Sequence, residues 1–221
     1  MPVRAVVFDL WDTIVEFVPA EGEALHRRIA ARLEVSHEKF DEVWYADEAI
    51  RRRNVGPIAP CFDAACAALG VEADVHELVS WRRELTRRAL RPRAGVLDTL
   101  RELRARGVHV GLISNCTEEV ADVWPETTFA PVFDVVVFSA TAGVAKPQPE
   151  IYRLALDGLA VAPPDAVFVG DGANDELRGA SDMGMTAVLI HREGSAPQWD
   201  NVVGWSGLRV TAIPQVLDLL P

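Results

Sequence analysis

A short apolar run near the amino terminus, Val3 to Phe8, constrains the fold more than any other part of this sequence. Apolar residues fill the run with almost no alternation, which indicates a strand buried on both faces. The run ends on a carboxylate, Asp9. In an α/β sheet, ligands bind in the crevice beyond the carboxyl ends of the strands. Asp9 is therefore either a residue that caps a strand or a reacting group.

Strand-like and helix-like segments alternate from residue 91 onward. Four more apolar runs read as strands, at Val108 to Ile113, Phe133 to Phe138, Ala166 to Gly170 and Thr186 to Ile190. Five strands separated by helices predict an α/β fold with a doubly wound parallel sheet. Right-handed crossovers bring the carboxyl ends of such strands to one edge. We therefore expect Asp9, Ser114 and Asp171 to converge, although they lie far apart in sequence.

Residues 16–90 interrupt this alternation with helical patterning alone. We predict four helices here, at 21–33, 36–53, 60–69 and from residue 74 through 85. Residues 1–15 and 91–221 would then form the core, and residues 16–90 an inserted four-helix cap. A long stretch at 192–207, with Trp199 and Trp205, is expected to cover a sheet edge or fill an interface. A final helix is predicted at Val216 to Leu220.

Composition excludes several classes of protein. A net charge of −11 argues against nonspecific binding to nucleic acid. No apolar run is long enough to span a membrane, and the amino terminus lacks the pattern of a signal peptide. The three cysteines have neither metal-type spacing nor a paired framework. We expect a cytoplasmic protein, a monomer or homodimer, with neither a membrane nor a nucleic acid as partner.

Four polar segments lie at predicted strand ends or in the loops that follow them. They are Phe-Asp-Leu-Trp-Asp-Thr at 8–13, Leu-Ile-Ser-Asn at 112–115, Ala-Lys-Pro-Gln-Pro at 145–149 and Val-Gly-Asp-Gly-Ala-Asn-Asp at 169–175. In this order they resemble the four motifs of the haloacid dehalogenase (HAD) superfamily. The resemblance implies a Rossmann-like core with a helical cap inserted after the first motif. It also implies a hydrolase that acts on a small anionic, phosphorylated substrate.

The resemblance implies a role for each motif residue. Asp9 would be the nucleophile and would form an aspartyl-phosphate. Ser114 and Asn115 would hold the phosphate, and Lys146 would bind it and stabilise developing charge. Lys146 and Lys39 are the only lysines in a chain that otherwise uses arginine. The implied cofactor is Mg²⁺, which prefers oxygen ligands; these would come from Asp9, the backbone carbonyl of Trp11, Asp171 and Asp175.

The sequence departs from the family pattern at Trp11, where phosphatases of the family carry an Asp that serves as general acid and base. An indole cannot protonate a leaving group or activate water. One interpretation is a Mg²⁺-dependent phosphatase that favours good leaving groups such as aryl or acyl phosphates. A second is a 2-haloacid dehalogenase, whose family motif has an aromatic residue here. A third is a catalytically impaired, HAD-like binding protein. Three carboxylates at one sheet edge need a cation among them, which favours the first interpretation, the Mg²⁺-dependent phosphatase.

Overall fold

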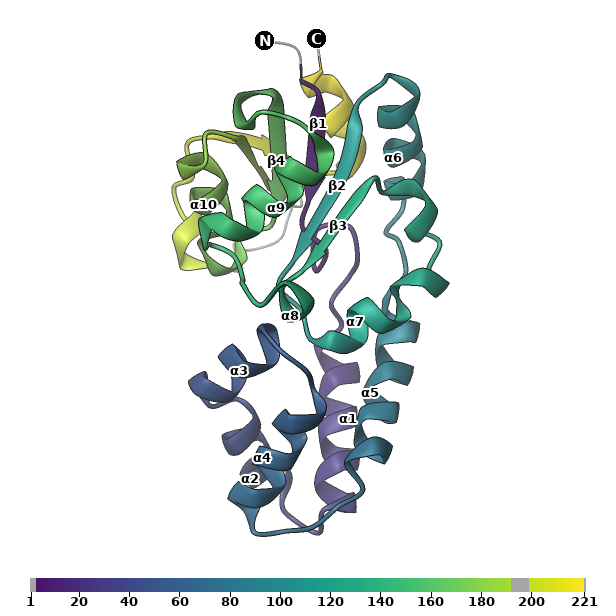
Figure 1. The fold of residues 1–221 in the computed structure, drawn as a ribbon, viewed down its shortest axis with the longest axis vertical. Coiled ribbons are helices and arrows are strands. Elements are labelled where there is room, and N and C mark those ends of the chain that lie inside the picture. Colours follow the sequence, from purple (N-terminus) through teal and green to yellow (C-terminus); the bar gives the residue numbers. More distant parts are fainter. Residues whose placement is uncertain (1–2, 192–198, 221) are drawn as a thin grey trace.

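A parallel sheet forms the centre of the computed structural model, which describes residues 3–191 and 199–220 (Figure 1). Across these residues the sheet has six strands in the order β3-β2-β1-β4-β5-β6, and all neighbours are parallel. The strands are β1 (Ala5–Phe8), β2 (His109–Ser114), β3 (Val135–Phe138), β4 (Ala166–Gly170), β5 (Thr186–Ile190) and β6 (Leu208–Val210). Because β1 pairs with both β2 and β4, Asp9 follows a central strand.

Helices cover both faces of the sheet. On one face, Val6 and Phe8 share an apolar cluster with α6, α7 and the 3-10 helix η6. On the other face, Ala5 and Val7 pack with α9 and α10. All four residues of β1 are buried, which is the two-sided burial that its unbroken apolar sequence predicts. The bounds are α6 (Val96–Ala105), α7 (Glu118–Val123), α8 (Ser139–Ala142), α9 (Pro149–Leu159), α10 (Glu176–Asp182) and η6 (Ile213–Leu219).

Short 3-10 turns complete the connections of the core. They are η1 (Trp124–Glu126), η2 (Ala130–Val132), η3 (Pro163–Asp165), η4 (Ala173–Asp175) and η5 (Asp200–Val202). The turn η4 directly follows the fourth motif's Asp171 and leads into α10. The turn η5 packs close to it, because Asn201 Nδ2 donates to the carbonyl oxygen of Gly172 at 2.8 Å. The fourth motif is therefore held by a segment about thirty residues further along the chain.

The inserted segment between β1 and α6 is wholly helical and has an apolar cluster of its own. Its helices are α1 (Pro19–Arg32), α2 (His37–Trp44), α3 (Asp47–Asn54), α4 (Ala59–Leu69) and α5 (Val75–Ala89). Phe40, Trp44 and Phe62 stack in this cluster, with ring centroids 5.5 and 4.6 Å apart. Figure 1 shows the helices beyond the end of the sheet toward which β1 runs. The insert therefore faces the edge that carries the motif residues.

Ion pairs join the insert to the core. Along α5, Arg82, Arg83 and Arg87 pair with acids of α7 and of the turn after it. The Arg82 pair with Glu119 is the buried one, since Glu119 has no exposed surface. The other two pairs are exposed and stabilise weakly. The α5–α7 contact thus fixes one side of the insert against the core.

The structure confirms the parallel α/β class and corrects three details. The sheet has a sixth strand among the described residues, β6, which has only three residues and lies at the edge. The insert has five helices rather than four, because the predicted helix 36–53 breaks after Trp44. Arg53 folds back there and donates to the Trp44 carbonyl oxygen, which compensates for the interrupted helix. The last helix is a 3-10 helix, Ile213–Leu219.

Two expectations are tested by the structure only in part or not at all. Part of the stretch 192–207 lies outside the described residues, but Trp199 and Trp205 are within them. The division of the chain at residues 15/16 and 90/91 stays a prediction. Among the described helices, none combines the length and apolar character needed to cross a bilayer.

Candidate active site

Asp9 and Lys146 meet at the carboxyl end of the central strand. Asp9 directly follows β1, and its backbone N–H donates to the carbonyl oxygen of Val169 in β4 at 2.9 Å. The Lys146 ammonium donates to Asp9 Oδ1 and, at 3.1 Å, to the carbonyl oxygen of Ile113. Both side chains are buried. The topology therefore brings together two charged groups that are 137 positions apart.

A third buried group, Glu176, completes this contact. Its Oε2 accepts from the Lys146 ammonium at 2.5 Å, and its Oε1 accepts from the backbone N–H of Gly172 at 3.0 Å. Oxygens of Asp9, Asp171 and Glu176 all lie within 4.8 Å of one another. Two of these carboxylates, those of Asp9 and Glu176, therefore share one ammonium, and with Asp171 beside them the group carries excess negative charge.

Burial and mutual repulsion shift the pKa values of these groups. Burial raises the pKa of Asp9, and although Lys146 opposes this shift, Asp171 adds to it. Burial and the Asp9 charge raise the pKa of Glu176 well above its usual range. Burial alone would lower the pKa of Lys146, but Asp9 and Glu176 outweigh it and the pKa is raised. The ammonium therefore stays charged, and a further cation among the carboxylates would relieve their repulsion.

Sequence reasoning selected Asp175 as a metal ligand and missed Glu176. Asp175 is exposed, and its Oδ1 accepts from Asn201 Nδ2 at 2.9 Å. Asn174 and Asp175 both have left-handed backbone conformations, with φ of 54° and 55°. This turn leaves the Asp175 side chain outside the carboxylate cluster and puts Glu176, at the start of α10, into it. Metal ligation by Asp175 remains a prediction.

Ser114 ends β2, and Asn115 follows it beside Lys146. The Ser114 hydroxyl is fully buried and has no hydrogen-bond partner in the described part of the chain. Asn115 holds the backbone of Lys146 twice, because its Oδ1 accepts from the Lys146 N–H at 2.8 Å and its Nδ2 donates to the Lys146 carbonyl oxygen at 2.9 Å. The side chain of Asn115 thus positions Lys146. Phosphate contacts of Ser114 and Asn115 remain predictions, and an unbonded buried hydroxyl suits the first.

A family model for haloacid dehalogenase-like hydrolases matches residues 3–184. The chain belongs to this family. A glyceraldehyde 3-phosphate phosphatase of Methanopyrus kandleri is 29% identical over 199 residues, which cover 86% of this chain and 84% of that protein. The resemblance stated from the four motifs is therefore confirmed, and the chain is a hydrolase of the HAD type.

Solved structures of HAD proteins share the fold. A HAD phosphatase from Thermococcus onnurineus has a TM-score of 0.70 at 22% identity, over 98% of this chain and 97% of that one. A 2-haloacid dehalogenase from Pseudomonas syringae also has a TM-score of 0.70, at 23% identity and the same coverage of both chains. At this identity the likeness concerns the fold, which phosphatases and dehalogenases of the HAD family share.

Trp199 contacts the candidate metal site of this HAD hydrolase. Its indole N–H donates to Asp171 Oδ2 at 2.8 Å, whereas Asp171 Oδ1 accepts from the backbone N–H of Ala173 at 3.0 Å. Both oxygens of Asp171 are thereby oriented. We expected Trp199 to cover a sheet edge or fill an interface, and the structure shows that it contacts Asp171 of the fourth motif. Nothing in the sequence pattern links residues 171 and 199.

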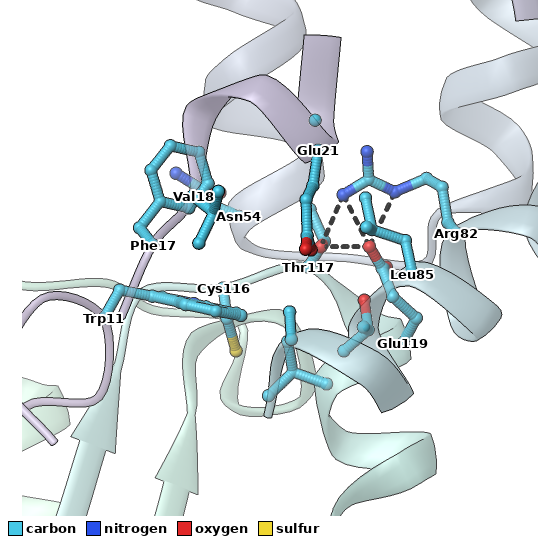
Figure 2. A pocket seen from close by; sticks show the side chains of 14 residues that line it. Trp11, Phe17, Val18, Glu21, Asn54, Arg82, Leu85, Cys116, Thr117 and Glu119 are labelled. Carbon is cyan, nitrogen blue, oxygen red and sulfur yellow. Dashed lines mark hydrogen bonds and ion pairs between the residues drawn. The ribbon is translucent and has the colours of Figure 1, made fainter. Parts of the chain in front are cut away.

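Trp11, which lies where the motif resemblance places the general acid of HAD phosphatases, lines a pocket between core and insert (Figure 2). Its ring meets that of Phe17 edge-on, with centroids 6.1 Å apart. The next residue, Asp12, accepts from Arg93 at 2.9 Å, which fixes the loop after the first motif. The pocket has a volume of about 220 Å³. Its lining includes Trp11, Phe17, Val18, Glu21, Asn54, Arg82, Leu85, Cys116, Thr117, Glu119 and Val120.

Cys116 is the cysteine nearest to the motif residues in sequence. Burial raises the pKa of its thiol to about 12. The thiol therefore stays protonated at neutral pH and is a poor nucleophile. Cys116 is therefore no candidate nucleophile, and the role of Asp9 as the nucleophile stays a prediction.

Proposed function

We propose that this HAD-like hydrolase is a Mg²⁺-dependent phosphatase that acts on small phosphorylated substrates through Asp9. The observation that carries the proposal is the cluster of Asp9, Asp171 and Glu176, in which Asp9 and Glu176 contact a single ammonium, that of Lys146. Three carboxylates and one ammonium leave an excess of negative charge, which a divalent cation would neutralise. The name of the Methanopyrus kandleri relative, a sugar-phosphate phosphatase, supports the same class of reaction.

The residues present suit a magnesium ion. Mg²⁺ is a hard cation that takes carboxylate oxygens and keeps several waters. Asp9, Asp171 and Glu176 would supply the protein oxygens, and the Trp11 carbonyl and Asp175 remain proposed as further ligands. When bound, the ion would neutralise charge on the phosphate oxygens. The Lys146 ammonium, held in place by Asn115, would add to this neutralisation.

The covalent steps would take place at Asp9. One of its carboxylate oxygens attacks phosphorus, and the bond from phosphorus to the leaving oxygen breaks with the electron pair going to that oxygen. The result is an aspartyl-phosphate. Water then attacks the same phosphorus, which releases inorganic phosphate and restores the Asp9 carboxylate. The unbonded Ser114 hydroxyl would hold a phosphate oxygen throughout.

Dehalogenation of a 2-haloacid is the second candidate, and Trp11 favours it. An aromatic residue at this position resembles the dehalogenase motif, and halide leaves without a proton. The cluster argues for the phosphatase, because a dehalogenase needs no metal and has no use for three buried carboxylates. A binding protein without activity would use Lys146 and Ser114 to hold an anion, but it would not need the nucleophile Asp9 beside them.

One comparison decides between these classes. Purified protein is assayed with a panel of phosphate esters and with 2-chloropropionate, once with Mg²⁺ and once with a chelator. The phosphatase predicts release of phosphate that depends on Mg²⁺ and is lost in Asp9→Asn, whose amide keeps the shape but is not nucleophilic. Activity on the haloacid alone, with or without metal, would identify a dehalogenase. No turnover of either class would favour the binding protein.

A further inference from the structure

We propose that the pocket beside Trp11 binds the leaving group of the substrate, and that this group is an uncharged aromatic ring, so that the substrate is an aryl phosphate. This inference rests on the proposed phosphatase function. To that function the inference adds the class of substrate on which the enzyme would act. Three features carry it: the position of the pocket, the nature of its wall, and the chemistry of the missing acid.

Two loops lead from the proposed phosphate site to the pocket. Trp11 is two residues beyond the nucleophile Asp9, and Cys116 is two residues beyond Ser114. Both line the pocket, and the opposite wall comes from α1 and α5 of the insert. A phosphate held by Ser114 and Lys146 would therefore direct its ester oxygen and leaving group toward this space.

The pocket has the size and surface of a site for one ring. Its volume of about 220 Å³ exceeds the roughly 150 Å³ of an apolar cavity that accepts benzene. Trp11, Phe17 and Leu85 contribute an apolar wall, together with Val18, Ala89 and Val120. The edge-on arrangement of Trp11 and Phe17 leaves ring faces and edges for a third ring to meet. Figure 2 shows these two rings on one side of the pocket.

The polar end of the pocket carries no net positive charge, since its lining has one cation, Arg82, and two acids, Glu119 and the exposed Glu21. Arg82 Nε donates to Glu119 Oε1 at 2.6 Å and its Nη2 donates to Thr117 at 3.2 Å. The remaining guanidinium nitrogen, Nη1, donates no hydrogen bond within the described residues. Because Glu119 offsets the Arg82 charge, the pocket suits a neutral ring better than a second anionic group. Nη1 could still donate to an oxygen substituent on that ring.

The missing acid points to the same class of substrate. Trp11 has no proton to give, and the acids that line the pocket are Glu119, which is held by Arg82, and the exposed Glu21. The leaving oxygen must then depart as an anion. A phenol has a pKa of about 10, whereas an alcohol lies near the 15.7 of water. A phenolate therefore leaves without the proton that an alkoxide requires, and takes one from water afterwards.

The test compares phenyl phosphate, acetyl phosphate and glycerol phosphate in the presence of Mg²⁺. Acetyl phosphate has a good leaving group without a ring, and glycerol phosphate has a poor one. We expect kcat/KM for phenyl phosphate to exceed that for glycerol phosphate by about 100-fold or more, the typical contribution of general acid catalysis. In Phe17→Ala the ratio of phenyl to acetyl phosphate kcat/KM should fall about tenfold, the loss typical of missing apolar contacts.

Phe17 is half exposed, so its truncation should leave folding intact. Leu154→Ala, an exposed residue of α9 outside the pocket, is the matched control and should keep the wild-type ratio. A binding measurement that needs no turnover accompanies the assay: wild type should bind phenylphosphonate about tenfold more tightly than methylphosphonate, and Phe17→Ala should lose this preference.

The outcomes separate the two proposals. Equal or better turnover of glycerol phosphate, or an unchanged ratio in Phe17→Ala, would overturn the aryl assignment while leaving a phosphatase. No turnover of any ester, with equal binding of both phosphonates, would remove the phosphatase function as well. A ring preference in binding without turnover of any ester would support the pocket and overturn the proposed reaction.

Discussion

Replacing Lys146 by Met tests the buried charge cluster directly. Methionine is unbranched like lysine and only one atom shorter, but it carries no charge, so Asp9 and Glu176 lose the ammonium that each contacts. Breaking a buried ion pair by removing one partner costs about 3–5 kcal/mol. We therefore expect the free energy of unfolding to fall by about this amount when a chelator is present. Bound Mg²⁺ should restore part of the loss, about 2.7 kcal/mol when its concentration is a hundred times its Kd.

Urea unfolding followed by circular dichroism, with Mg²⁺ and with a chelator, measures both effects. The chain offers a matched control, because Lys39 is its only other lysine and is exposed on α2. Lys39→Met should change stability by less than about 0.5 kcal/mol. If Lys146→Met unfolded at the wild-type urea concentration in chelator, the three carboxylates could not depend on this ammonium. An absence of any Mg²⁺ effect on either protein would refute the proposed ion site.

Three further predictions concern the metal and the missing acid. Because Trp199 donates to Asp171, Mg²⁺ should change the tryptophan fluorescence of the wild type, and Trp199→Phe should abolish most of the change; an equal response in both would exclude a contact at the site. Calorimetric titration should show that Glu176→Gln binds Mg²⁺ about tenfold or more weakly than Asp175→Asn, since only Glu176 joins the carboxylate cluster. The reverse order of the two affinities would restore Asp175 as the direct ligand. Trp11→Asp should raise turnover of alkyl phosphates more than that of p-nitrophenyl phosphate, because the poorer leaving group needs the proton; a folded, Mg²⁺-binding variant without gain on either ester would show that the acid is not limiting.

The sequence predicted the core of the fold because its signals there are local and strong. The run at β1 has no polar residue from Ala5 to Phe8, and the structure buries all of it between two layers of helices. The alternation of strands and helices predicted that Asp9, Ser114 and Asp171 converge at one edge, and in the structure oxygens of Asp9 and Asp171 lie within 4.8 Å of each other. In a parallel sheet with right-handed crossovers, the carboxyl ends of the strands meet at one edge. An alternation of strands and helices therefore predicts where the residues after each strand lie.

The features that the sequence did not reveal depend on tertiary contacts. The helix predicted at 36–53 has no Gly or Pro inside it, yet it breaks after Trp44, where Arg53 donates to the freed Trp44 carbonyl oxygen. Glu176 looked like an ordinary first-turn residue of α10, since the left-handed turn at Asn174 and Asp175 that directs it inward has no glycine to mark it. β6 is too short for a periodic signal. Secondary-structure propensity and hydrophobic periodicity are local signals, and they do not predict structure that tertiary contacts determine.

The central claim is that Asp9 attacks phosphorus, and trapping the intermediate tests it most directly. Protein is mixed with Mg²⁺ and p-nitrophenyl phosphate, quenched with acid within the first turnover, and digested for mass spectrometry. The account predicts one phosphoryl group on the peptide that contains Asp9, absent when a chelator replaces Mg²⁺ and absent in Asp9→Asn. Phosphate release with no phosphoryl group on Asp9, or wild-type turnover by Asp9→Asn, would contradict the account.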